Sequence, residues 1–290
     1  MGLRSRVRIH PDAWFLWSIL LPAIALCAFV FIYPAYVGLR DSVTARDGAL
    51  TTRYFTYLLG DKLFGQSLVR TFLFAALAVT LEFALGFAIA LLLIRPLRAI
   101  TFFRASLLVP WVLPPAVMGF AWRWIFYEDY GVVNDLMVRA GLVDAPISFL
   151  GDPAWAFATI VFADTWKTAP FVGIILLAGL AVIPPDLYEA AAIDGAGRVR
   201  RFFLITLPML VPYMLTALLF RLVQTIGIFD LVYVLTGGGP SSSTEMISLY
   251  IRKETFDFLN VSYGAAMSVT LFVIVLAIAT VISFFSRRRF

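Results

Sequence analysis

Charge, cysteine and histidine are all scarce in this chain of 290 residues. Charged residues make up 14% of the sequence, cysteine and histidine occur once each, and 61% of the residues are hydrophobic. A soluble domain carries about 25% charged residues, and a mean hydropathy of +0.91 excludes such a domain. The single cysteine excludes an internal disulfide bond. This composition is typical of a membrane protein with several spans.

The sequence also lacks the residue sets that most enzymes use. Its one histidine, His10, lies in a basic N-terminal tail, so a nucleophilic triad has no candidate base, and no cysteine and histidine cluster has the spacing of a metal site. A phosphate-binding loop requires two glycines before its Lys-Ser/Thr pair. Before Lys167 and Thr168, Val161 and Trp166 occupy those two positions. We therefore expect no catalytic activity, no metal site and no cofactor in this chain.

Six apolar segments are long enough to cross a membrane, which takes about 20 residues of helix. A helix satisfies its backbone hydrogen bonds within the segment, so each span is expected to be helical. We therefore predict an all-α polytopic membrane protein, with residues 1–290 forming a single transmembrane domain. The approximate bounds of the predicted spans are residues 14–36, 68–94, 103–126, 155–180, 209–233 and 265–285.

The net charge of +5 is distributed as a topology signal rather than as a patch for nucleic acid. With the N-terminus inside, the inner segments hold twelve basic and four acidic residues, and the outer segments hold eight basic and eleven acidic ones. Lysine and arginine favour the cytoplasmic side, so both termini are predicted to be cytoplasmic. Each inner segment carries three arginines: Arg4, Arg6 and Arg8; Arg95, Arg98 and Arg104; Arg198, Arg200 and Arg201; and Arg287, Arg288 and Arg289.

A polar island over residues 184–208 separates the fourth and fifth predicted spans. Pro185 suits the first turn of a helix, and the carboxylates of Asp186 and Glu189 would lie at the positive end of its dipole. Gly195 is typical of the residue just past a helix end. The island therefore predicts a helix of about ten residues across the membrane surface. A second helical stretch over residues 198–205 would lead into the fifth span.

The spacing within this island resembles the cytoplasmic "EAA" loop of permease subunits of ABC importers. The matching positions are Glu189, Ala190, Ala191, Gly195, Ile205, Leu207 and Pro208. Residues 235–244, which read Leu-Thr-Gly-Gly-Gly-Pro-Ser-Ser-Ser-Thr, resemble an outer loop of maltose-type carbohydrate permeases, on the side of the larger of their two paired subunits. The resemblance implies the compact fold of a type I importer permease, with six transmembrane helices and a short cytoplasmic coupling helix.

The same resemblance implies a function and a set of partners. The chain would be the permease subunit of an ATP-driven importer for a sugar, polyol or glycerol phosphate, in a bacterial or archaeal plasma membrane. It would pair with a second, homologous permease, two ATP-binding subunits and an extracytoplasmic solute-binding protein, so the partners would bind the ATP. On its own, Glu189 would be explained as a carboxylate that stabilises its own helix. The resemblance implies instead that the ATPase is coupled through Glu189, Ala190, Ala191, Asp194 and Gly195.

Several ionisable or polar side chains fall near the centres of predicted spans. Charges at that depth usually face a bundle interior or a wet cavity. One interpretation is internal pairing, of Asp164 with Lys167 and of Glu82 with Arg221. The other is a substrate path, whose candidates are Arg221, Gln224, Lys167, Asp164, Glu82 and Trp166. An alternative function, an ion- or proton-coupled secondary transporter, would use these charges as a relay.

Overall fold

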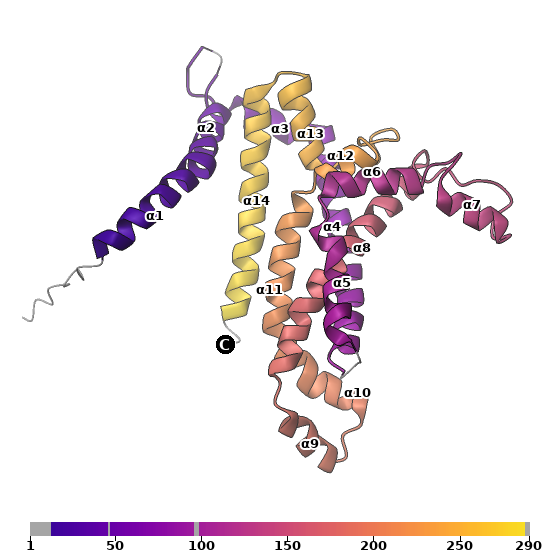
Figure 1. The fold of residues 1–290 in the computed structure, drawn as a ribbon. Helices are drawn as coiled ribbons and strands as arrows, with labels where there is room; N and C mark the ends of the chain where they lie inside the picture. The colour runs from indigo at the N-terminus through magenta and orange to yellow at the C-terminus, as the bar shows by residue number, and fades with distance from the viewer. Residues whose placement is uncertain (1–12, 46, 96–98, 288–290) are drawn as a thin grey trace, which may run out of the picture. The chain divides into compact units, whose positions relative to one another are not determined.

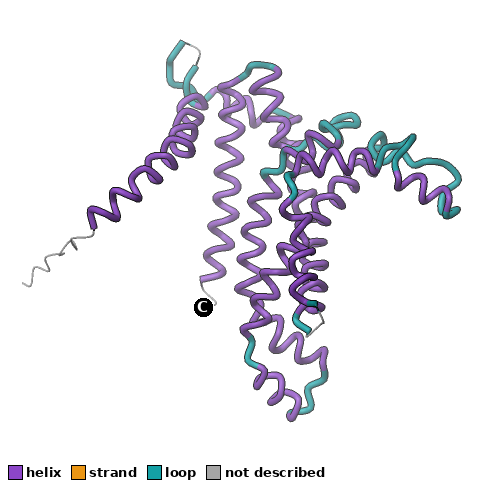
Figure 2. The backbone as a smooth tube through the Cα atoms, viewed as in Figure 1, coloured by secondary structure: helices purple, strands orange, loops and turns teal. Residues whose placement is uncertain are grey.

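The computed structural model describes residues 13–45, 47–95 and 99–287, and within these ranges regular structure is helical apart from one isolated β-bridge between Thr44 and Leu50 (Figures 1 and 2). His10 and six of the predicted inner arginines, Arg4, Arg6, Arg8, Arg98, Arg288 and Arg289, lie outside the described residues. The helices are α1 (Ala13–Cys27), α2 (Tyr33–Ser42), α3 (Arg53–Gly60), α4 (Lys62–Leu93), α5 (Ile100–Val112), α6 (Pro115–Ile125), α7 (Val132–Arg139), α8 (Pro153–Val182), α9 (Pro185–Ile193), α10 (Arg198–Arg201), α11 (Leu207–Ile226), α12 (Asp230–Leu235), α13 (Ile247–Arg252) and α14 (Val261–Arg287). Three π-helical turns join neighbouring helices: η1 (Ala28–Ile32), η2 (Phe202–Thr206) and η3 (Lys253–Asp257).

The helices confirm an all-α polytopic membrane fold. Five helical stretches in the described residues are long and apolar enough to cross a membrane, and a bent pair of helices supplies a sixth candidate. The five stretches are Trp17–Ser42, Lys62–Leu93, Pro153–Val182, Arg198–Ile226 and Val261–Phe284, and the bent pair is α5 with α6.

Two of the predicted spans differ from the observed helices. Residues 103–126 do not form one straight helix, because α5 and α6 are bent by 90° at the break between them. Pro114 and Pro115 cause the break, since proline has no N–H to donate and forces its predecessor out of the helical region. The predicted fifth span over 209–233 was wrong at its C-terminal end, where α11 stops at Ile226 and α12 begins at Asp230.

Side-chain caps set the start of the two longest helices. Asp61 accepts hydrogen bonds from the backbone N–H groups of residues 63 and 64 at 2.8 and 3.2 Å, and α4 begins at the next residue. Asp152 does the same for α8, with bonds of 2.9 and 3.0 Å, and Pro153 occupies the first helical position. A carboxylate at this position satisfies N–H groups that have no partner within the helix.

The chain divides into two compact units. The first contains residues 1–60 and 254–271, and the second contains residues 61–253 and 272–290. In the first unit, the stretch of residues 17–42 that could span a membrane contains an apolar window of 18 residues, none of which is buried, as expected of a helix that faces lipid. The rings of Tyr57 and Tyr263 meet edge to face at 5.0 Å within this unit. The assignment of all 290 residues to one transmembrane domain stays a prediction.

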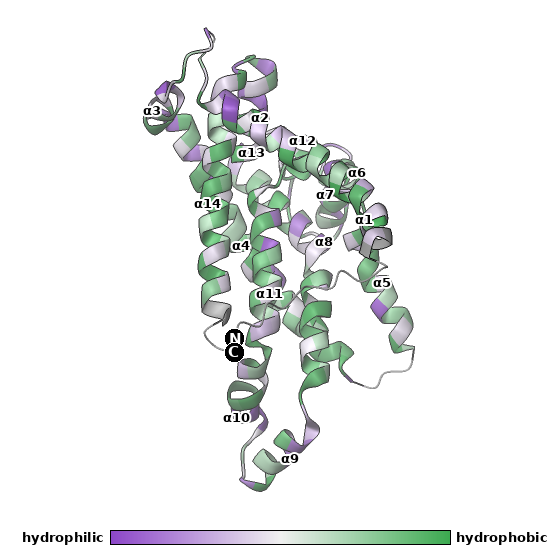
Figure 3. Ribbon diagram, turned by 90° about the vertical axis from the view of Figure 1, so that its left-hand side faces the viewer, coloured by the Kyte–Doolittle hydropathy of each residue, from purple (hydrophilic) through white to green (hydrophobic). Residues whose placement is uncertain are grey.

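The second unit is built around α4, α8 and α11, which pack against one another. Its core is apolar, with Phe74, Ile160 and Leu176 fully buried. The backbones of α4 and α8 approach closely at Gly86, where an added Cβ would lie 2.8 Å from the side chain of Val172. Small residues allow such approaches between membrane helices. In Figure 3 these long helices are predominantly hydrophobic, whereas hydrophilic residues are frequent in the loop around α9.

Candidate functional site

The interior of the second unit contains a buried ion pair between α4 and α11. Arg221 donates from Nε to Oε2 of Glu82 at 2.6 Å and from Nη2 to Oε1 of Glu82 at 2.7 Å. Their exposed fractions are 3% and 0%. Two parallel bonds between a guanidinium and a carboxylate form the strongest common geometry for such a pair. The predicted pairing of Glu82 with Arg221 is therefore confirmed.

Further polar side chains complete the shell around this pair. Arg221 Nη2 also lies 3.0 Å from Asp164 Oδ2 and from Thr225 Oγ1, and its Nη1 donates to Gln224 Oε1 at 2.8 Å. The Thr168 hydroxyl lies 2.7 Å from Glu82 Oε1. Each nitrogen of the guanidinium thus has at least one acceptor within the protein. We call Glu82, Asp164, Thr168, Arg221 and Thr225 the charge cluster.

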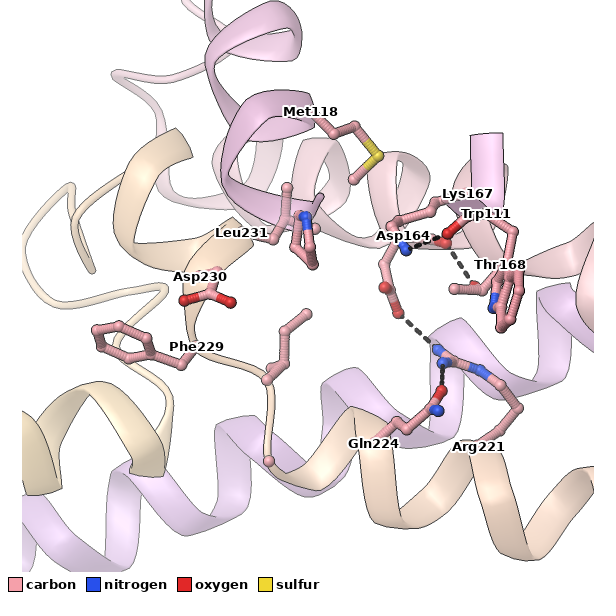
Figure 4. Close-up of a pocket in the computed structure, with 13 residues that line it drawn as sticks. Trp111, Met118, Asp164, Lys167, Thr168, Arg221, Gln224, Phe229, Asp230 and Leu231 are labelled. Atoms are coloured by element: carbon pink, nitrogen blue, oxygen red, sulfur yellow. Dashed lines mark hydrogen bonds and ion pairs between the residues drawn. The ribbon is translucent and has the colours of Figure 1, made fainter. Parts of the chain in front are cut away.

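A cavity of about 370 Å³ lies beside the charge cluster (Figure 4). Its lining includes Asp164, Thr168, Arg221 and Gln224 from the cluster and its edge, together with Lys167, Trp111, Met118, Phe229 and Asp230. Lys167 donates from Nζ to the backbone carbonyl of Trp111 at 3.0 Å, which leaves two of its three N–H donors for other acceptors. The size and mixed lining suit a small polar solute.

The structure separates the predicted substrate-path residues into groups. Arg221, Gln224, Lys167 and Asp164 line the cavity, whereas Glu82 lies behind Arg221 and is fully buried. Trp166 packs edge to face on Trp122 at 5.4 Å and is not among the residues that line the cavity.

The predicted pairing of Asp164 with Lys167 was wrong. The two residues are three apart on α8, but Asp164 turns to Arg221 and Lys167 to the backbone of Trp111. The guanidinium of Arg221 offers Asp164 a partner inside the bundle. The side chain of Lys167 is longer than that of Asp164 and reaches α5 at the cavity wall.

Three candidate functional residues are not predicted from the sequence. Thr168 and Thr225 lie four residues after Asp164 and Arg221, so the helical period could have placed them beside the charges. Asp230 falls inside the predicted fifth span, whereas α11 ends at Ile226 and α12 begins at Asp230.

The loop between α8 and α11 forms the second candidate site. The helix predicted within this loop is confirmed as α9, with Pro185 at its first turn; its place across the membrane surface stays a prediction. Gly195 adopts φ +76°, its N–H donates to the carbonyl of residue 192 at 3.1 Å, and that of Ala196 donates to the carbonyl of Ala191 at 2.9 Å. These two bonds form a Schellman motif, as expected for a glycine past the helix end. Glu189, Ala190 and Asp194 are exposed, and Ala191 is partly buried.

Residues 82–289 match the family of binding-protein-dependent transport system inner membrane components. The chain belongs to this family. The matched region contains the complete charge cluster, the cavity lining and the α9 loop. A member of this family is a permease subunit rather than an enzyme, and the chain is a multi-pass membrane permease.

Two relatives align with nearly the whole permease. It is 36% identical over 270 residues to the sulfoquinovosyl glycerol transport system permease protein of Agrobacterium fabrum, covering 91% of this chain and 87% of that protein. It is 37% identical over 289 residues to the trehalose/maltose transport system permease protein of Thermococcus litoralis, covering 97% and 96%.

A solved structure shares the fold. The permease superposes, with a TM-score of 0.82 and 25% identity, on a chain in a crystal structure of a bacterial alginate ABC transporter in complex with alginate pentasaccharide-bound periplasmic protein, and it covers 97% of this chain and 96% of that one. The expected type I importer fold is confirmed.

Proposed function

We propose that this chain is the permease subunit of an ATP-driven importer for a sugar or a related hydroxyl-rich solute. The names of the relatives support the solute class, since they refer to sulfoquinovosyl glycerol, trehalose, maltose and alginate. Separate ATP-binding subunits would hydrolyse the ATP, because the sequence has no phosphate-binding loop. The alternative of an ion-coupled secondary transporter gains no support from the family match.

The exposed face of α9, which we call its outer face, is the observation that supports this proposal. Tyr188 and Ala191 are the partly buried residues of the helix, and the opposite face presents Glu189, Ala190 and Ile193. Ile193 is 87% exposed, and the same loop exposes the carboxylates of Asp186, Glu189 and Asp194. An apolar side chain next to a carboxylate on a short exposed helix fits a groove of a partner protein. We assign that partner as the ATP-binding subunit.

Glu189→Lys tests this coupling role. A reversed charge at a docked surface places like charges together, so the variant should remain in the membrane but lose its ATP-binding subunit and stop importing solute. Co-purification of the two subunits and uptake in membrane vesicles measure the result. Asp144→Lys, which reverses an exposed carboxylate outside this loop, is the matched control. Normal uptake by an intact Glu189→Lys complex would refute the assignment.

The same loop sets the orientation of the permease. If α9 meets an ATPase, it must face the cytoplasm, as the arginines of the neighbouring α10 favour. In a Cys27→Ala background, a cysteine introduced at Arg198 should react with an impermeant reagent only from the cytoplasmic side. One introduced at Ser242 should react only from outside. Cytoplasmic labelling at Ser242 would contradict the topology and the predicted cytoplasmic termini.

The remaining partners follow from the transport cycle. In this chain alone the cavity is open on one side. A second, homologous permease would close it from that side. A solute-binding protein would deliver the solute from outside, and the complex of the alginate transporter with its periplasmic protein supports such a partner. Alternating access would then expose the cavity to each side in turn as the ATP-binding subunits close and move α9.

Within the cavity, Lys167, Gln224 and Asp230 are the proposed contacts to the solute. Lys167 has free donors, Asp230 is an exposed acceptor, and Gln224 lies at the cavity edge of the charge cluster. Arg221 is already bonded to two carboxylates, so its proposed role is to position the three helices. The Trp111 ring, stacked on Phe171 at 5.3 Å, would offer an apolar face to a sugar ring.

A further inference from the structure

The inner face of α9 is attached to the start of the fifth span through one tyrosine. The Tyr188 hydroxyl lies 2.9 Å from Thr206 Oγ1, so one of these groups donates to the other. Thr206 is only 5% exposed, so the bond is partly buried, and a hydrogen bond that is shielded from water is stronger. The Tyr188 ring packs on the apolar core between α4, α8 and α11.

The backbone of Tyr188 is held as well. Arg201, in the short helix α10, donates from Nη1 to the Tyr188 carbonyl at 3.4 Å. Both partners of Tyr188 thus belong to the segment of residues 198–206 that leads into α11. That segment is itself seated on α4, because the ring of Phe202 meets Phe87 edge to face at 6.2 Å.

The covalent connections of α9 leave its helix axis at both ends. On one side, residues 183 and 184 are extended, with ψ of 120° and 132°. On the other, the chain passes through Gly195 in the left-handed region and Gly197 with ψ of 168°. Neither connection continues the helix axis. The side chain of Tyr188 is the link that crosses directly from α9 to the next span.

Thr206 is the last residue of the π-helical turn η2, and α11 begins at the next residue. Arg221 follows fifteen residues later on the same helix, roughly 22 Å along the axis at ~1.5 Å per residue. A displacement of Thr206 would therefore move α11, the helix whose Arg221 and Gln224 line the cavity. Turns of this π type often mark functional positions.

We infer that Tyr188 is a positioning residue that transmits movement of α9 to α11 through its hydrogen bond with Thr206. Glu189 and Ile193 would receive the partner on the outer face, while Tyr188 passes the displacement inward. This inference rests on the proposed coupling function of α9 but assigns a different residue and a different contact. It predicts that α9 and α11 move together only while the bond is intact.

Distances between spin labels test the link. In a Cys27→Ala background, labels at Ala192→Cys on α9 and Thr216→Cys on α11, both exposed positions, report the separation of the two helices. The otherwise unchanged protein should give one narrow distance distribution that stays in place when ATP and vanadate are added to the purified complex. Tyr188→Phe keeps the ring but removes the hydroxyl. It should raise the population of displaced conformers about fivefold, the change expected from a hydrogen bond of about 1 kcal/mol.

Matched variants decide between transmission and general damage. Thr206→Val should reproduce Tyr188→Phe, the double variant should add nothing, and Thr206→Ser should restore the narrow distribution. Tyr213→Phe removes a hydroxyl from the same apolar core and should have no effect. An unchanged distribution in Tyr188→Phe, effects that add in the double variant, or an equal effect of Tyr213→Phe would overturn the inference. Failure of the ATP-binding subunit to bind the unmutated permease would instead refute the proposed function, and the distances in the permease alone would still test the link.

Discussion

The charge cluster and α9 satisfy their side chains in opposite ways. In the cluster, Glu82 and Arg221 are buried and bonded within the chain. On α9, Ile193 and Glu189 are exposed, and the attachments described above run through Tyr188 on the opposite face. A buried charge requires a partner within the chain, whereas the exposed Ile193 is free to meet the partner protein proposed above. The first region is therefore satisfied within the fold, and the second is the surface proposed to bind another subunit.

The comparison predicts its largest effect on folding at Arg221. Arg221→Ala leaves two carboxylates buried without their cation, which typically costs about 3–5 kcal/mol. The variant should lose most of its folded yield in the membrane, as measured by size-exclusion chromatography of the solubilised protein. A neutral triple variant, with Glu82→Gln, Asp164→Asn and Arg221→Gln, should recover yield. The pair Glu82→Gln with Arg221→Gln should recover less, because Asp164 remains charged. Normal yield and transport in Arg221→Ala would show that the buried carboxylates do not need this cation, and would refute the contrast between the charge cluster and α9.

A smaller effect is expected at Gly195, where α9 ends. Any residue with a Cβ is strained at a positive φ, by roughly 1–2 kcal/mol, but no atom lies within 4 Å of the position of an added Cβ. Gly195→Val should therefore shift the end of α9 and weaken binding of the ATP-binding subunit while overall yield stays high. Gly195→Asn, which tolerates this conformation, should bind almost normally. Equal binding by the valine and asparagine variants would show that the conformation is not what matters.

Lys167 is intermediate between the buried charge cluster and the exposed face of α9, since it is half-buried and bonded to one backbone carbonyl. Lys167→Met should cost about 1 kcal/mol for that bond and reduce solute uptake with the ATP-binding subunit still bound. Lys167→Arg keeps the charge and the donors and should retain part of the uptake. Initial uptake rates at several solute concentrations separate weakened binding from slowed transport. Wild-type uptake by Lys167→Met would remove this residue from the substrate path.

The smallest effect on stability is expected at Ile193. Exposed substitutions usually change stability by no more than about 0.5 kcal/mol, so Ile193→Asp should melt like the unmutated permease. It should nevertheless fail to retain the ATP-binding subunit. Leu136→Asp, at a 60% exposed position on α7, controls for a charge placed on an exposed apolar side chain. Retention of the subunit by Ile193→Asp would place the docking surface elsewhere.

Local chemistry explains what could be predicted. The apolar segments had to be helices because a membrane leaves no other partner for the backbone. Pro185 and Gly195 bracket α9 because each favours one end of a helix. The bend at Pro114 was missed, although proline chemistry allows it, because apolar composition continues across the break. The end of α11 was missed for the same reason.

The sequence alone determined most of the spans, the helix α9 and the polar residues that had to be satisfied inside the membrane. Only the tertiary structure decided which of them meet. Glu82 and Arg221 are 139 residues apart in the sequence. Asp164 bonds to Arg221 rather than to Lys167, which is nearer in the sequence, because the packing of α4, α8 and α11 brings the guanidinium within reach. Tyr188 meets Thr206 for the same reason. Helical periodicity fixes the face of each residue, but the register between helices depends on side-chain packing along their whole length.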